Sequence, residues 1–165
     1  MAYVSVDPAK PPGILTSRRA AAVLDFLEQC AGASEKALAL VFPDAAGCLK
    51  ILRGTGYVRR CFLPGQEPLW VPASSPVPVK ETYMGRLALG WLACRAKEAG
   101  CRVSAGYVKF PGGQVYKMAW WPGVLPDCPA VVVSVNGKTP KGGGQLWWTT
   151  LERLRTLKLK DALMQ

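Results

Sequence analysis

The feature that most restricts how this chain can fold is a series of short helical patterns followed by two strand patterns, all within residues 17–73. Apolar residues recur at helical spacing in three runs: 18–30, 35–42 and 45–53. A residue type that commonly caps a helix N-terminus precedes each run: Ser17, Ser34 and Asp44. Two alternating apolar and polar stretches follow, at 57–63 and 68–72, with the strong turn signal Pro-Gly-Gln-Glu between them. The sequence therefore predicts three helices and then a β-hairpin.

The stretch from Cys48 to Pro72 resembles the third helix and wing of the winged helix-turn-helix superfamily. In that superfamily a helix ends in a small-residue turn, and an apolar and aromatic strand then carries basic residues into the wing. The sequence RGTGYVRR at 53–60 has this pattern. The resemblance implies a winged helix over 17–73 that binds double-stranded DNA, with the third helix in the major groove and the wing on the backbone or minor groove.

On this sequence the resemblance implies DNA contacts from the third helix, the first wing strand and the wing tip. The residues at these places are Lys50, Arg53, Arg59, Arg60 and Gln66. Arg18 and Arg19, at the start of the first helix, can reach a phosphate. The third helix offers Ala46 and Gly47 where base-reading proteins often place Arg, Asn or Gln, so phosphate binding is expected more than sequence readout. In the alternative interpretation, the two wing-strand arginines only solvate an edge strand.

The second half is predicted to follow a Pro- and Ser-rich linker. Its patterns are a long helix, a hairpin, a continuous β-branched strand and a final helix, at 81–99, 102–122, 130–135 and 146–163. The predicted fold class is α+β: an N-terminal winged helix-turn-helix followed by a small α-β-β-β-α domain with one antiparallel sheet. The expected divisions are an N-terminal arm, the winged helix, the linker and a basic α+β domain, at 1–16, 17–73, 74–80 and 81–165.

The charge of the chain favours a polyanionic partner. Twenty-one Lys and Arg face eleven Asp and Glu, which gives a formal net charge of +10. Residues 80–165 carry thirteen basic and five acidic groups, a net of +8, whereas residues 1–79 carry eight and six, a net of +2. Nucleic acid is the commonest polyanion of a cytoplasm, and the loop at 136–145 adds Lys138 and Lys141 as phosphate contacts. Solubility alone is the alternative explanation of the charge.

The cysteines and the missing histidine exclude several kinds of chemistry. No two of the six cysteines have CxxC spacing, and the chain contains no histidine. This removes Ser–His and Cys–His nucleophile pairs, His-ligated metals and the usual general base near neutral pH. We therefore expect no catalytic residue, no metal and no cofactor. No apolar run reaches the roughly 20 residues of a membrane span, and no secretory signal is recognisable, so a cytoplasmic protein is expected.

An alternative interpretation of the second half is a nuclease. A helix, three strands and a helix also describe the core of the PD-(D/E)xK nucleases, and PD at 126–127 and NGK at 136–138 resemble their two motifs. In that family two carboxylates hold Mg²⁺ and the lysine supports the attacking water. Asparagine replaces the second carboxylate here, so cleavage is not expected; it would require Asp127, Glu81 and Lys138 to converge. The arrangement of the two halves is similar in layout to the replication-relaxation proteins of plasmids and mobile elements.

The tryptophan pairs at 120–121 and 147–148 support a third hypothesis. An exposed tryptophan near Lys109, Lys117 and Lys141 could stack on an unpaired base, and core packing or a subunit contact is the alternative. The sequence thus leaves three functions open. The preferred one is a DNA-binding transcriptional regulator or a replication or mobile-element accessory factor. The others are a protein-interaction adaptor, acting as a homodimer or on another protein through a tryptophan-rich surface, and a degenerate nuclease.

Overall fold

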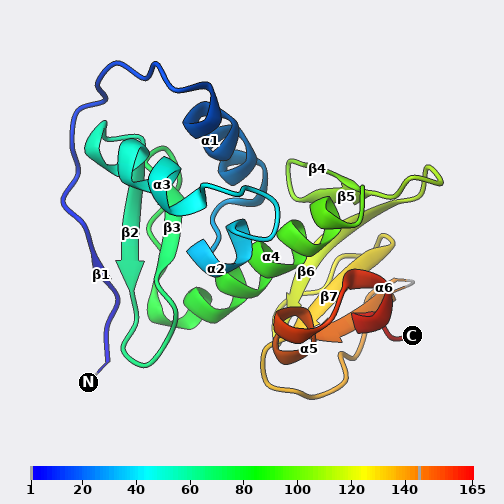
Figure 1. Cartoon of the computed structure of the whole chain (residues 1–165). Coiled ribbons are helices and arrows are strands. Elements are labelled where there is room, and N and C mark those ends of the chain that lie inside the picture. The colour runs from blue at the N-terminus through cyan, green and yellow to red at the C-terminus, as the bar shows by residue number, and fades with distance from the viewer. Residues whose placement is uncertain (1, 145) are drawn as a thin grey trace.

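The computed structural model of the chain describes residues 2–144 and 146–165. Its first half contains a short N-terminal strand, three helices and a hairpin (Figure 1). These elements are β1 (Ser5–Val6), α1 (Arg18–Cys30), α2 (Glu35–Leu38), α3 (Ala45–Gly54), β2 (Val58–Phe62) and β3 (Leu69–Pro72). The predicted order of three helices followed by a hairpin is confirmed.

Local side-chain chemistry fixes the beginnings of the first two helices. The hydroxyl of Ser17 accepts the backbone N–H of Ala20 at 3.2 Å, and the hydroxyl of Ser34 accepts that of Ala37 at the same distance. Both bonds are the predicted N-terminal caps. Asp44 makes no such bond, although α3 begins directly after it. α2 is shorter than its apolar run, because the chain continues there as a turn.

The first sheet is antiparallel throughout and has the strand order β1-β2-β3. β1 pairs with the 61–62 end of β2, so the N-terminal arm adds a strand that the sequence does not predict. On the other side of the hairpin, Ala33 lies between α1 and α2 and bridges to Trp70 of β3. The backbone N–H of each residue donates to the carbonyl of the other, at 3.0 and 2.9 Å. The hairpin is therefore tied both to the N-terminal arm and to the helices.

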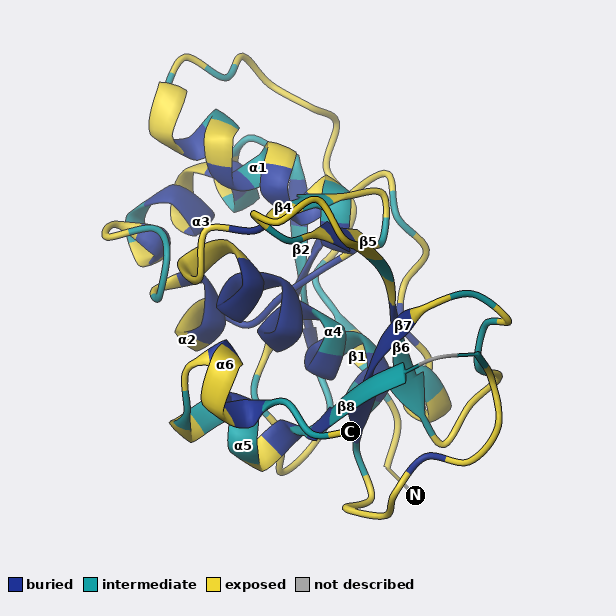
Figure 2. Ribbon diagram, turned by 90° about the vertical axis from the view of Figure 1, so that its right-hand side faces the viewer, coloured by how far each residue is buried: buried dark blue, intermediate teal, exposed yellow. Residues whose placement is uncertain are grey.

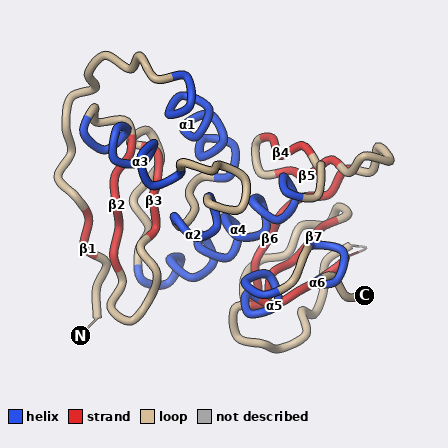
Figure 3. The backbone as a smooth tube through the Cα atoms, viewed as in Figure 1, coloured by secondary structure: helices blue, strands red, loops and turns tan. Residues whose placement is uncertain are grey.

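The second half contains one long helix, a five-stranded sheet and two short helices (Figure 3). These elements are α4 (Lys80–Glu98), β4 (Arg102–Ser104), β5 (Tyr107–Lys109), β6 (Val115–Trp121), β7 (Ala130–Ser134), β8 (Leu146–Thr150), α5 (Leu151–Thr156) and α6 (Leu159–Ala162). Strands β4, β5 and β6 pair antiparallel, whereas β6, β7 and β8 run parallel. The prediction of one antiparallel sheet with three strands is wrong, and the sheet is mixed.

Two features of the chain explain this difference. Ala105 and Gly106 have left-handed backbone, with φ of 49° and 81°, and they divide the predicted strand at 102–110 into the tight hairpin β4–β5. The connection 122–129 and the described part of the next one, 135–144, return the chain to the end of the sheet from which the preceding strand began. They also lie together, because the N–H of Gly144 donates to the carbonyl of Pro126 at 3.2 Å.

The segment 146–150, which the sequence predicts as helix, is the edge strand β8. Tryptophan and threonine favour the extended backbone of a sheet, where their bulky side chains pack well. Only after them does Thr150 begin a helix, its hydroxyl accepting the N–H of Arg153 at 3.2 Å. The final helix is therefore shorter than predicted and is divided into α5 and α6.

One continuous hydrophobic core joins the two halves, and α4 lies at its centre (Figure 2). Gly90 of this helix faces the first half, and a Cβ placed on it would lie 2.6 Å from the carbonyl oxygen of Gly32. Gly85 faces the second half, and a Cβ there would lie 2.3 Å from the ring of Trp120. Glycine inside a helix is unfavourable by about 1 kcal/mol relative to alanine. The close approach of neighbours from both halves explains why α4 contains two of them.

We expect Gly90→Ala to lower the free energy of unfolding by about 1–2 kcal/mol, because the added methyl group meets backbone atoms of Gly32 and Ala33. Gly54→Ala at the end of α3 is the control, since no atom lies within 4 Å of a Cβ placed there. It is expected to stabilise the protein by up to about 1 kcal/mol. Urea denaturation measures both changes. Equal effects of the two substitutions would contradict the tight packing of α4.

Candidate functional site

Three of the basic residues predicted to bind DNA are exposed on the helices of the first half. Arg18 and Arg19 occupy the first turn of α1, and Lys50 lies on the outer side of α3. Arg19 lines a hollow together with Asp44 and Cys48 at the beginning of α3. The four ion pairs formed within residues 2–144 and 146–165 include none of these three cations. Their charge is therefore available to an anion from outside.

Two other predicted DNA contacts are held by the N-terminal arm. The Asp7 carboxylate receives the guanidinium of Arg53, with Nη2 at 3.0 Å from Oδ1 and Nε at 2.8 Å from Oδ2. The backbone carbonyl of Asp7 accepts Nε and Nη2 of Arg59 at 3.0 and 2.9 Å. The N–H of Arg60 donates to Asp7 Oδ2 at 3.1 Å. Asp7 thus partly neutralises the basic residues of α3 and β2 from within the fold.

Arg60 makes its contacts on the opposite side of β2. The carbon centre of its guanidinium lies 4.7 Å from the ring centroid of Phe62 and 5.5 Å from that of Trp70, so it stacks on both rings. Its Nε is buried without a hydrogen-bond partner in the described part of the chain. Gln66 is exposed in the hairpin turn and lines, with Arg60, a cavity of about 410 Å³. Of the predicted wing contacts, only Gln66 projects fully into solvent.

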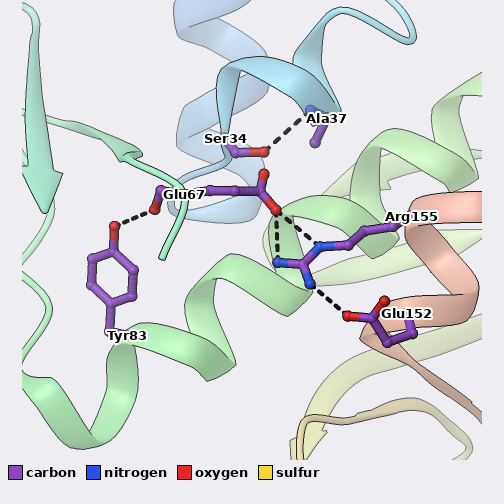
Figure 4. A network of polar contacts seen from close by, with 6 residues as sticks. All are labelled: Ser34, Ala37, Glu67, Tyr83, Glu152 and Arg155. Carbon is purple, nitrogen blue, oxygen red and sulfur yellow. Dashed lines mark hydrogen bonds and ion pairs between the residues drawn. The ribbon is translucent and has the colours of Figure 1, made fainter. Parts of the chain in front are cut away.

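A polar network fixes the hairpin turn to α4 and α5 (Figure 4). Arg155 donates from Nε to Glu67 Oε1 at 2.9 Å and from Nη1 to Glu152 at 2.7 Å, and its Nη2 forms an ion pair with Glu67 Oε1 at 2.7 Å. The hydroxyl of Tyr83 donates to the carbonyl of Glu67 at 2.6 Å. Burial raises the pKa of Tyr83 to about 12, so this hydroxyl keeps its proton. The turn is therefore anchored to the second half of the protein.

Two of the three residues of the nuclease hypothesis, Asp127 and Lys138, do not come together. Asp127 precedes β7 and Lys138 follows it, so they lie at opposite ends of a strand about 16 Å long. The side-chain oxygen of Asn136 accepts the N–H of Lys138 at 3.0 Å and lies 3.0 Å from the hydroxyl of Ser134, which closes a local turn. Within the described residues, no three Asp, Glu or Cys side chains form a group that could hold a metal ion.

Arginines and lysines differ in how far their side chains are engaged in contacts within the fold. Seven of the ten arginines donate hydrogen bonds or stack on aromatic rings within the fold: Arg53, Arg59, Arg60, Arg86, Arg95, Arg153 and Arg155. The other three, Arg18, Arg19 and Arg102, are exposed. All eleven lysines are exposed, the predicted contacts Lys138 and Lys141 among them. The positive charge that a polyanion meets is therefore mostly lysine.

The tryptophans are more buried than they would be if they stacked on unpaired bases at the surface. Trp70 and Trp91 are buried, and the pairs at 120–121 and 147–148 are half-buried. The ring of Trp120 lies against Gly85 of α4, and Trp147 packs on the hydrophobic core. The exposed large apolar side chains are scattered instead over the arm, α3, the connections and the β4–β6 strands.

Asp7, Glu67 and Arg155 are not identifiable from the sequence as part of the site. No local sequence pattern marks these residues, because Asp7 lies 46 residues from Arg53 and Glu67 lies 88 residues from Arg155.

None of the described helices is long and apolar enough to cross a membrane. No protein-family model, curated protein or solved structure matches the chain.

Proposed function

We propose that the protein binds duplex DNA through a winged helix-turn-helix made of α1, α2, α3, β2 and β3. The observation that carries the proposal is the order of these elements, three helices and then an antiparallel hairpin. The bridge between Ala33 and Trp70 supports it, because it fixes the helices against the hairpin. A rigid unit of this kind can present one helix to a DNA groove. Such a protein would act as a transcriptional regulator or as a replication or mobile-element accessory factor.

Phosphate binding is the contact that the exposed side of this unit favours. Arg18, Arg19 and Lys50 are exposed cations outside the ion pairs of the described residues. The outer side of α3 also carries Ala46 and Ile51, whose side chains offer no hydrogen bond to a base edge. Contacts to the phosphates of the DNA backbone position a protein on the duplex without distinguishing one base sequence from another. We therefore expect binding to many duplex sequences with similar affinity.

The test is binding to a fluorescently labelled duplex of random sequence, about 30 base pairs long, at about 50 mM and about 200 mM salt. The variant Arg18→Ala/Arg19→Ala/Lys50→Ala is expected to bind about 30-fold more weakly at the lower salt. The slope of log affinity against log salt is expected to fall by about 3, because three phosphate contacts are lost. Arg59 and Arg60 are left intact, since substituting them also removes bonds and stacking that hold the fold.

The matched control is Lys80→Ala/Lys158→Ala/Lys160→Ala, which removes three exposed positive charges from the start of α4, from the residue before α6 and from α6 itself. It changes the net charge by the same amount but leaves the outer side of α3 intact. Equal losses in both variants would show that only net charge matters and would contradict the proposal. Failure of the unmodified protein to bind the duplex at the lower salt would also contradict it.

A further inference from the structure

The outer face of strands β4, β5 and β6 is an uncovered basic surface. The strand register places Arg102, Lys109 and Val115 in one row across the sheet, and Ser104, Tyr107 and Lys117 in the next. All six of these residues are exposed, whereas the alternate residues of the same strands are buried or half-buried. Figure 2 shows the exposed residues along β4 and β5. This sheet face, defined by these six residues, contains three cations and no acid.

The like charges on the sheet face are unfavourable unless an anion is bound. Arg102 and Lys109 are direct cross-strand partners, and such pairs place their Cβ atoms about 5 Å apart. Like charges directly opposite each other destabilise a sheet. No ion pair of the described residues involves Arg102, Lys109 or Lys117. A phosphate chain crossing the strands would relieve this repulsion and would release its counterions.

Tyr107 adds an aromatic surface to the same face. Its side chain is 42 % exposed, and Val115 in the neighbouring row is 49 % exposed. Tyr107 is the cross-strand partner of Lys117, so a ring and a cation lie side by side. Aromatic rings next to cations bind unpaired bases by stacking, because every base has a planar face. In a duplex those faces are already stacked inside the helix and cannot reach a flat sheet.

A hollow lies beside Lys117, at the end of this row of the sheet face. It measures about 320 Å³ and is lined by residues 117–120 of β6, by Leu89 of α4 and by residues 123–126 of the following connection. Because residues from both faces of β6 and from α4 line it, the hollow is not part of the sheet face, which consists of the six exposed residues alone.

We infer that the sheet face binds single-stranded nucleic acid, with Arg102, Lys109 and Lys117 on the phosphates and Tyr107 stacked on a base. This surface lies on β4, β5 and β6, outside the elements proposed to bind duplex DNA. The inference therefore does not depend on the proposed winged helix. Either activity can be lost while the other is kept.

The test is the fluorescence anisotropy of a labelled oligothymidylate of about 12 nucleotides, which forms no duplex. The variant Arg102→Ala/Lys109→Ala/Lys117→Ala is expected to bind about 30-fold more weakly at about 50 mM salt. Its salt slope is expected to fall by about 2, since each phosphate contact on a single strand contributes about 0.7. Tyr107→Leu is expected to lose about tenfold in affinity, whereas Tyr107→Phe keeps the ring and is expected to lose little.

Two further variants separate this surface from general charge effects and from the first half. Lys80→Ala/Lys158→Ala/Lys160→Ala and Arg18→Ala/Arg19→Ala/Lys50→Ala are both expected to retain most of the oligothymidylate binding. The inference is overturned if the unmodified protein does not bind the oligonucleotide at about 50 mM salt. It is also overturned if the sheet-face variant loses only duplex binding, or if the control with three substituted lysines loses as much affinity as the sheet-face variant.

Discussion

Arg155→Ala is expected to lower the free energy of unfolding by about 2–3 kcal/mol, at or slightly below the range of about 3–5 kcal/mol for breaking a buried ion pair, because the Arg155 side chain is 27 % exposed. Arg155 supplies both the hydrogen bond and the shorter ion-pair contact that the Oε1 atom of Glu67 receives, and Oε2 of the same carboxylate is already buried without a hydrogen-bond partner in the described part of the chain. The Glu67 side chain is only 15 % exposed. Without Arg155 it would be a largely desolvated charge with no counter-charge, which is unfavourable.

Two comparison variants distinguish the loss of the pair from the loss of a large side chain. Glu67→Gln/Arg155→Met removes both charges at similar volume and is expected to restore much of the lost stability. Glu152→Ala removes the mostly exposed second partner of Arg155 and is expected to change stability by less than about 1 kcal/mol. Guanidinium chloride denaturation of the three variants measures these differences. A double variant less stable than Arg155→Ala would contradict the desolvated carboxylate as the cause.

The same network bears on the proposed function. The hairpin turn that contains Gln66 is held by Glu67 to α5 and by Tyr83 to α4. If this hairpin acts as the wing of the proposed DNA-binding unit, a turn fixed in this way cannot adapt independently to a DNA groove. Arg155→Ala removes one of the two attachments and leaves the bond from Tyr83, so its effect on duplex binding would report on how much the fixed position of the turn matters.

The parts of the fold that could be predicted are those controlled by near neighbours in the sequence. Ser17 and Ser34 cap their helices through residues three positions away, so their patterns identify where α1 and α2 begin. The hairpin β2–β3 follows from its turn and its alternating strands. The direction of β7 and β8 depends instead on how two loops cross the sheet and pack on each other, as Gly144 does on Pro126. No short pattern encodes that contact.

For the candidate site, too, some features could be predicted from the sequence and others could not. The sequence identifies the basic residues, because their type and position are visible directly. It does not identify which of them are already bonded within the protein, because Asp7 approaches Arg53 and Arg59 only after β1 joins the sheet. Arg18, Arg19 and Lys50 are exposed, and no acidic residue of the described chain forms an ion pair with them. The sequence alone thus shows which residues are charged, whereas only the fold shows which of those charges are neutralised by a partner.

The buried thiols lead to the second large effect, a loss of stability in alkaline solution. Burial raises the pKa of Cys30 and of Cys61 from 9.0 to about 11, and it also raises the pKa of Cys94 well above 9.0. In the unfolded chain these thiols ionise near pH 9. Between pH 9 and 11 the unfolded state therefore binds fewer protons than the folded state, and the free energy of unfolding falls as the pH rises. The stabilisation is complete below pH 9.

We expect Cys30 and Cys61 together to reduce the free energy of unfolding by about 3 kcal/mol for each pH unit between 9 and 11, since each thiol contributes about 1.4 kcal/mol per unit. Urea denaturation under reducing conditions at pH 8, 9, 10 and 11 measures the total slope, to which Cys94 and Tyr83 also contribute because burial raises their pKa values. The difference between the unmodified protein and each cysteine variant then gives the contribution of that thiol. Cys30→Ala and Cys61→Ala each remove one titrating thiol, so each is expected to make the slope shallower by about 1.4 kcal/mol per unit. Both lose packing as well, but that loss is independent of pH and shifts the whole curve instead.

The reactivity of the thiols provides an independent check on the same burial. Cys128 is half-buried, whereas the other five cysteines are buried. A thiol reagent at pH 8 is therefore expected to modify Cys128 first, and the remaining five only at the rate at which the protein opens. Rapid modification of Cys30 or Cys61 in the folded protein would show that these thiols are accessible. The alkaline slope would then have to come from other groups, because a thiol in contact with water ionises at nearly the same pH in both states.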